Sequence, residues 1–151
     1  MYFFECKPFY RLTHDELYQI MALRQEVFVV EQDCPYLDAD GKDQSSWHLM
    51  GFDQSKKLVA YSRLVPRGIS YEKYVSIGRI VSSPSVRGKG VGKKLIVESL
   101  KNIKELFREQ PIKISAQCYL IKFYQSFGFE TTGEEYLEDN IPHIAMVYSE
   151  N

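Results

Sequence analysis

The chain has 151 residues, of which 44% are hydrophobic and 26% charged, so it can bury the core of one globular domain spanning residues 1–151. Its formal net charge of −1 excludes the strongly basic surface that nucleic-acid binding requires. It contains no signal peptide and no run of 18 apolar residues, and its three cysteines lack metal-ligand spacing. These features indicate a reduced, cytoplasmic protein with no membrane, nucleic-acid or metal partner.

The first elements predicted are a strand and a helix. Residues 2–7 are rich in aromatic side chains, which favour a strand. Thr13 and Glu16 have the spacing of a capping box, which opens a helix. Apolar side chains then recur at helical spacing, so we expect this helix to run from residue 14 to about 28.

An acidic loop follows over residues 33–46, rich in Asp, Gly, Pro and Ser. Asp38, Asp40 and Asp43 suggest the start of a calcium loop. Such a loop needs a bidentate Glu at its twelfth position, where this chain has Leu49. We therefore interpret the aspartates as turn residues.

The rest of the chain alternates between strand and helix patterns. Strands are predicted over residues 47–53, 57–65, 74–82 and 112–117, and final strands over 129–132 and 144–148. A long amphipathic helix is marked by Val91, Leu95, Ile96, Leu100, Ile103 and Phe107. A short helix is expected over 119–126 with Gly128 as its C-cap, and a polar loop over 133–143. The order of elements predicts one α+β domain.

The stretch Arg87-Gly88-Lys89-Gly90-Val91-Gly92 lies between a strand and the long helix. Glycines there let an anion approach the backbone, and the N–H groups at a helix N-terminus attract negative charge. A Walker A loop is excluded because Lys94 follows Gly92-Lys93 where Ser or Thr is required. The glycine spacing and the distance from the strand also differ from a dinucleotide fingerprint. The stretch predicts a pyrophosphate site of another kind.

Together with the preceding strand, this stretch resembles the acetyl-CoA signature of the GNAT N-acetyltransferases. A second segment, with Gln117 at the end of a strand followed by Phe123-Tyr124 and Phe127-Gly128-Phe129, resembles the family's second CoA-binding segment. The segments LRQEVFVVEQ, CPYLDADGKD and YLEDNIPHIAM extend the resemblance to the ElaA-like branch of the family. Asn140 stands where that branch leads us to expect Gly.

The resemblance implies the GNAT fold: a mixed central sheet of about six or seven strands, flanked by about four helices, with two splayed strands forming the CoA cleft. It implies acetyl-CoA as the cosubstrate and no metal. The residues expected to bind it are Ile80, Val81, Ser82, Arg87, Gly88, Lys89, Gly90, Val91, Gly92, Lys93, Gln117 and Tyr124.

The implied reaction moves an acetyl group directly to a primary amine of a small molecule or peptide. Tyr124 matches the family's tyrosine that gives a proton to the CoA sulfur. The strand that often carries a general base offers only Ser76, Gly78 and Arg79, so the base must come from elsewhere. We favour His143, then Glu31; the remaining candidates are His48, Glu138 and Asp139.

Two other functions remain open. Arg24, Asp40, Asp43 and Arg63 have spacing similar to that of acyl-homoserine-lactone synthases, which use acyl carrier protein and S-adenosylmethionine. Alternatively, Arg24 ties the first helix to the acidic loop by salt bridges. A non-catalytic module that binds acetyl-CoA is the third reading. Many GNAT proteins are homodimers, but no interface can be identified in this sequence.

Overall fold

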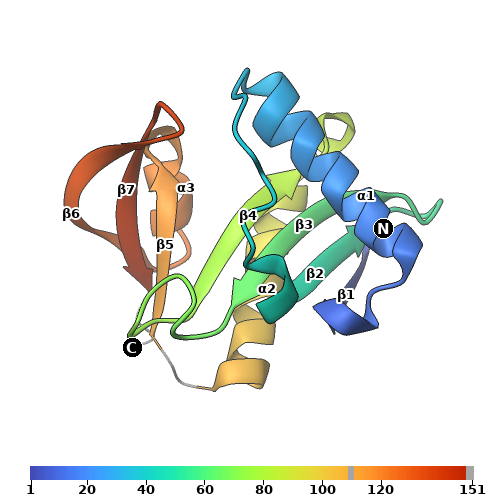
Figure 1. Ribbon diagram of the computed structural model, residues 1–151, viewed down its shortest axis with the longest axis horizontal. Helices are drawn as coiled ribbons and strands as arrows, with labels where there is room; N and C mark the ends of the chain where they lie inside the picture. Colours follow the sequence, from blue (N-terminus) through green and yellow to red (C-terminus); the bar gives the residue numbers. More distant parts are fainter. Residues whose placement is uncertain (109–110, 149–151) are drawn as a thin grey trace.

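A computed structural model describes residues 1–108 and 111–148 of the chain as two sheets that lie side by side (Figure 1). The larger sheet is antiparallel, with the strand order β1-β2-β3-β4. Its strands are β1 (Phe3–Pro8), β2 (Trp47–Phe52), β3 (Leu58–Val65) and β4 (Ser76–Ser82). Each lies within two residues of a predicted strand.

Helices cover both faces of this sheet, α1 (His14–Arg24) on one and α2 (Val91–Phe107) on the other (Figure 1). The predicted capping box opens α1, since Thr13 Oγ1 accepts from Glu16 N and the Glu16 carboxylate accepts from Thr13 N. The helical path then continues beyond residue 28 as a π-helical segment, η2 (Gln25–Glu31). Ile20 and Leu23 of α1 pack on one face of the sheet, while Val91 and Leu95 of α2 pack on the other.

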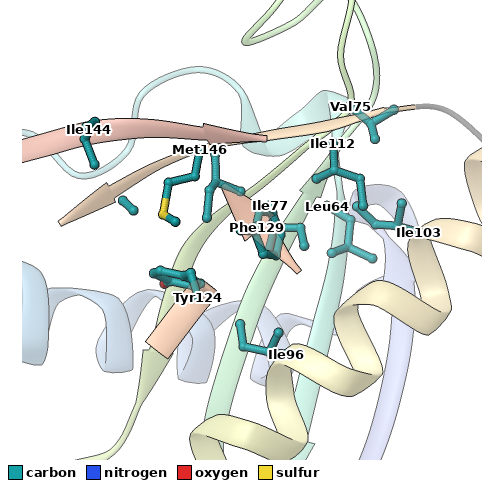
Figure 2. Packing of buried hydrophobic residues seen from close by; sticks show 12 residues of the cluster. Leu64, Val75, Ile77, Ile96, Ile103, Ile112, Tyr124, Phe129, Ile144 and Met146 are labelled. Carbon is teal, nitrogen blue, oxygen red and sulfur yellow. The ribbon is translucent and has the colours of Figure 1, made fainter. Parts of the chain in front are cut away.

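The smaller sheet contains the last three strands in the order β5-β7-β6, and α3 (Ile121–Gln125) packs against it. The strands are β5 (Ile112–Gln117), β6 (Phe129–Glu138) and β7 (Ile141–Tyr148). Figure 2 shows the core that joins this sheet to α2 and to the larger sheet; Phe129 and Met146 of the smaller sheet belong to the same buried cluster as Ile96 and Ile103 of α2. Single-turn 3-10 helices complete the elements: η1 (Phe9–Arg11), η3 (Asp43–Ser45), η4 (Pro84–Val86) and η5 (Cys118–Leu120).

The two sheets are connected at one end by a parallel bridge between Val75, just before β4, and Ile112 at the start of β5. Val75 N donates to Pro111 O and Lys113 N donates to Val75 O at this point. From there β4 and β5 diverge, and they are assigned to separate sheets. The expected pair of splayed strands is therefore present. Residues 1–108 and 111–148 contain seven strands and three α-helices, which place them in the expected α+β class.

The predicted polar loop over residues 133–143 is wrong. Most of it belongs to strands, because β6 extends to Glu138 and β7 begins at Ile141. Asp139 and Asn140 form the turn between them, both with positive φ (52° and 64°). Asn is tolerated in this conformation, so its presence in place of the expected Gly preserves the turn.

No helix among residues 1–108 and 111–148 is long and apolar enough to cross a membrane.

Candidate active site

A pocket of about 510 Å³ lies between the splayed strands β4 and β5. One wall is β4 from Ile77 to Ser82, and the opposite wall is formed by β5, α3 and the β6–β7 hairpin. The segment that runs from η2 into the acidic loop forms a third side. The pocket brings together ten residues predicted as functional: Glu31, Ile80, Val81, Ser82, Arg87, Gln117, Tyr124, Glu138, Asp139 and His143.

The glycine loop adjoins this pocket at Arg87 and keeps its backbone accessible. Gly88 and Gly90 have φ values of +80° and +77°, and no atom lies within 4 Å of a Cβ placed on either residue. Gly90 is the N-cap of α2 and offers no capping side chain. Lys94 N donates to Gly90 O, so the N–H groups of residues 91–93 precede the helical hydrogen-bond ladder. This arrangement can receive an anion through main-chain donors.

Two of the residues predicted to bind CoA, Val91 and Arg87, do not have side chains that are free to contact a ligand at the loop. Val91 is buried between α2 and the larger sheet, so it can offer only its backbone to a ligand at the loop. The Arg87 guanidinium forms two hydrogen bonds of 2.6 Å with the Glu31 carboxylate. This pair joins η2 to the glycine loop across a separation of 56 residues.

The ion pair also changes the chemistry of Glu31. Hydrogen bonding from the Arg87 guanidinium lowers the pKa of the Glu31 carboxyl. A carboxylate with a lowered pKa accepts a proton less readily, so this geometry disfavours Glu31 as the general base. The role of Glu31 as the general base therefore stays a prediction.

A β-bulge shapes the wall formed by β4. Gly78 pairs with Arg63 of β3 and Val81 pairs with Tyr61, so Arg79 and Ile80 both lie opposite Ser62. Arg79 has a φ of +49° within the strand. A bulge leaves part of the backbone outside the ladder, and such N–H groups are available to a bound ligand.

Tyr124 contacts both the core and the pocket. Its ring packs edge-on against Phe123 and Phe129, and only 5% of the residue is exposed. Burial raises the pKa of its phenol well above the ordinary value. Tyr124 therefore retains its proton at neutral pH and can act as a proton donor.

His143 lies on β7 directly opposite Gln117 of β5, in the pocket wall. Its Nδ1 lies 2.6 Å from Ile141 O, an atom that can only accept, so Nδ1 carries a hydrogen. In the neutral ring the lone pair is then on Nε2, which lies 3.5 Å from Glu138 Oε2. Tyr136 stacks on the imidazole with ring centroids 6.2 Å apart. A neutral imidazole held in this tautomer can accept a proton at Nε2.

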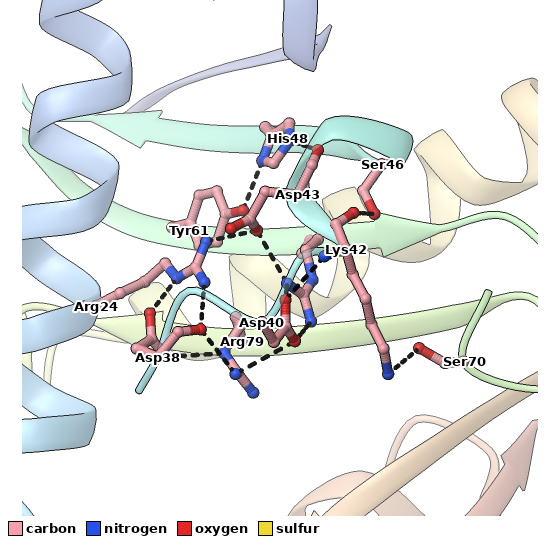
Figure 3. Close-up of polar contacts among 11 residues, drawn as sticks. Arg24, Asp38, Asp40, Lys42, Asp43, Ser46, His48, Tyr61, Ser70 and Arg79 are labelled. Carbon is pink, nitrogen blue, oxygen red and sulfur yellow. Dashed lines mark hydrogen bonds and ion pairs between the residues drawn. The ribbon is translucent and has the colours of Figure 1, made fainter. Parts of the chain in front are cut away.

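The acidic loop takes part in a buried ion cluster rather than in turn hydrogen bonds alone (Figure 3). Arg24, which is fully buried, donates to Asp38 and Asp43, and Arg63 donates to Asp40 and Asp43. This confirms that Arg24 ties α1 to the acidic loop by salt bridges. The hydrogen bonds from these arginines lower the pKa of Asp43 against the opposing effect of burial.

His48 is structural. Its Nδ1 lies 2.6 Å from Tyr61 Oη and its Nε2 lies 2.9 Å from Asp43 O, so both ring nitrogens are occupied. Burial lowers its pKa and favours the neutral form. His48 does not line the pocket.

Sequence reasoning missed Ser115 as a pocket residue, and it did not identify the partner of Arg79. Ser115 Oγ donates to Glu138 Oε1, and Arg79 is held by an ion pair of 2.9 Å between its Nε and Asp38 Oδ1. The strand alternation of β5 could have identified Ser115, because Ser115 and Gln117 share one face of that strand. Only the three-dimensional course of the acidic loop could reveal the partner of Arg79.

The residues present fit CoA, because the open glycine loop offers backbone donors for its pyrophosphate and β4 offers an unpaired edge facing β5. Within the described part of the chain, no group of three or more His, Cys, Asp or Glu side chains is placed to hold a metal ion.

Comparison with known proteins gives consistent results. Residues 16–150 match the family described as Acetyltransferase (GNAT) domain. Protein ElaA of Escherichia coli (strain K12) is 42% identical over 137 residues, which cover 89% of this chain and 88% of that protein. The crystal structure of an acyl-CoA N-acyltransferase from Pseudomonas aeruginosa superposes with a TM-score of 0.93 at 42% identity, covering 99% of this chain and all of that one. The crystal structure of Escherichia coli ElaA superposes with a TM-score of 0.91 at 37% identity over similar fractions.

Proposed function

Because the chain belongs to the GNAT acetyltransferase family, we propose that it transfers the acetyl group of acetyl-CoA directly to a primary amine. The observation that carries this proposal is one pocket that contains a proton donor, a proton acceptor and the entrance to an anion-binding loop. The donor is the phenol of Tyr124, and the acceptor is Nε2 of His143. The loop is headed by Arg87.

The binding half of the pocket would hold CoA through the main chain. Backbone N–H groups between Gly88 and Lys93, other than that of Lys89, which donates to Val86 O, would bind the pyrophosphate. The edge of β4 from Ile80 to Ser82 would pair with the amides of the pantetheine arm, and Gln117 faces it from β5. Bound in this way, acetyl-CoA supplies an electrophilic carbonyl and a thiolate leaving group.

The protein's own groups handle protons and charge. A primary amine has a pKa of about 10 and is almost fully protonated at pH 7, so it needs a base before it can attack. His143 Nε2 would take this proton, directly or through water, and Tyr124 would give its proton to the departing sulfur. Backbone N–H groups at the bulge of β4 would stabilise the negative charge that develops on the carbonyl oxygen, a role in which one donor contributes about 2.7–4 kcal/mol.

Thiol release during incubation with acetyl-CoA and a panel of amines tests the proposal, with CoA affinity measured by calorimetry. Tyr124→Phe removes the proton donor, so we expect kcat to fall about 10²- to 10⁴-fold while CoA affinity changes little. Tyr148→Phe is the matched control, because Tyr148 packs in the same core but does not line the pocket. Tight CoA binding without turnover of any amine would instead favour a non-catalytic acetyl-CoA-binding module.

A further inference from the structure

The charges that line the pocket are unevenly balanced. Two arginines line it, and each is paired with a carboxylate, Arg79 with Asp38 and Arg87 with Glu31. Two further carboxylates, Glu138 and Asp139, lie together at the hairpin end of the pocket. No lysine or arginine of residues 1–108 and 111–148 forms an ion pair with either of them. This end of the pocket is therefore electronegative.

The negative charge of Glu138 lies in a fixed position relative to His143. His143 is 95% buried, and because its Nδ1 hydrogen is used by Ile141 O, the neutral ring presents a lone pair at Nε2. That lone pair faces Glu138 Oε2 across 3.5 Å, and Ser115 Oγ donates to the other oxygen of the same carboxylate. Two acceptors so close to each other are stabilised by a group that donates a hydrogen bond to both. The N–H groups of an ammonium supply such a donor.

Apolar surface adjoins these acceptors. Tyr36 and Leu37 line the same pocket and are 47% and 85% exposed. Two contacts bring their segment against the hairpin: Cys34 Sγ donates to Asp139 O at 3.0 Å, and Asn140 Nδ2 donates to Tyr36 Oη at 3.3 Å. A molecule whose nitrogen reaches Glu138 would thus place its body beside an aromatic ring and a leucine side chain.

We propose that the acceptor is a cationic primary amine on an apolar body, without a carboxylate beside its nitrogen. An alkylamine or arylalkylamine fits this description, whereas an amino acid would bring its own carboxylate against Glu138 and Asp139. This inference rests on the proposed function and specifies the substrate class of the same pocket.

The reaction balances for such a substrate. A C–N bond forms between the amine nitrogen and the acetyl carbon, and the C–S bond to CoA breaks. The ammonium loses two protons in becoming an amide. One of these protons balances the proton that the departing sulfur takes from Tyr124, and the other is released to solvent.

Matched substrate pairs test the inference. Phenethylamine and L-phenylalanine, like isoamylamine and L-leucine, differ only by the carboxylate beside the nitrogen. With the wild-type protein and acetyl-CoA, we expect kcat/KM to be at least about tenfold higher for the amine of each pair, because the amino acid adds a like charge. Glu138→Gln should bring this ratio towards one. Glu134→Gln should leave it unchanged, because Glu134 is an exposed residue of the same strand that does not line the pocket.

The possible failures are distinguishable. Equal or faster turnover of the amino acids, or a ratio that Glu138→Gln does not change, would overturn the inference and leave the acetyltransferase function in place. Absence of turnover for every amine and amino acid, with CoA binding intact, would overturn both.

Discussion

Arg87 is the residue whose partners should change when CoA binds. In the structure its guanidinium is bound to Glu31, a carboxylate that a pyrophosphate at the glycine loop would repel. Both side chains are more than 40% exposed, so the pair is partly screened by solvent. Sequence alone could not suggest this pairing, because 56 residues separate the partners and each had a different predicted role.

Glu31→Gln should therefore strengthen CoA binding. The substitution removes the competing carboxylate and frees Arg87 for the phosphates, and exposed ion pairs contribute about 0.2–1 kcal/mol, so we expect a decrease in Kd of about 1.4- to 5-fold. Calorimetric titration with CoA measures it. Glu72→Gln is the control, as it removes the same charge from an exposed position outside the pocket. An unchanged or weaker affinity in Glu31→Gln would show that the pair does not compete with CoA.

At the scale of elements, strands whose sequence is apolar and bounded by turn residues were predictable, and the full extent of the β6–β7 hairpin was not. β2, β3 and β5 are bounded by turn residues and rich in apolar side chains, and α2 has a single apolar face. β6 is different, because every residue after Phe129 is exposed and the strand therefore lacks alternating hydrophobicity. Its pairing with β7 makes it a strand, a tertiary effect that local composition does not encode. For the same reason the sequence placed His143 in a loop, although it lies on β7.

The glycine loop offers an element-scale prediction. Gly90→Glu places a charged side chain where phosphate is proposed to bind, and its positive φ adds strain of about 1–2 kcal/mol. We expect loss of CoA binding with a modest decrease in the free energy of unfolding, measured by calorimetry and urea denaturation. Gly68→Glu controls for the strain, since Gly68 also has a positive φ (96°) and open space at Cβ but lies outside both the glycine loop and the pocket. Retained affinity in Gly90→Glu would contradict the assignment of this loop.

At the scale of the whole molecule, the ion cluster joins α1, the acidic loop, β3 and β4 into one unit beside the pocket (Figure 3). The sequence suggested that Arg24 binds the acidic loop, but not that Arg63 and Arg79 bind the aspartates of the same loop, because the partners are 14 to 41 residues apart. The splayed sheet was predictable through the family resemblance alone. Composition and periodicity do not distinguish one continuous sheet from two diverging ones.

Asp43→Asn should destabilise the protein by about 3–5 kcal/mol, because it leaves Arg24 and Arg63 buried without a shared carboxylate. Asp33→Asn, at an exposed position, should change stability by less than about 0.5 kcal/mol. Urea denaturation at neutral pH compares the two. Equal stability of both variants would show that the cluster contributes little to folding.

The same cluster determines a pH dependence of stability. Hydrogen bonds and charges from Arg63 lower the pKa of Asp40 despite its burial, and those from Arg24 and Arg63 lower that of Asp43. Since the unfolded chain binds protons at higher pH than the folded protein does, the stabilisation is complete above the ordinary carboxyl pKa and is lost as pH falls through the folded values. We expect the free energy of unfolding to decrease below about pH 4. Asp43→Asn should decrease less steeply, and an identical slope would contradict the assignment.

The contacts of Cys34 with Asp139 and of Tyr36 with Asn140 also have a consequence for the order in which the molecule is built. Each joins positions more than 100 residues apart, whereas β1 to β4 and the two long helices lie within residues 3–107. During synthesis the larger sheet can form before the final hairpin has left the ribosome, because chains fold from the N-terminal side as they emerge. The end of the pocket where we propose that the amine binds, beside Glu138 and Asp139, can therefore form only after the final hairpin has emerged.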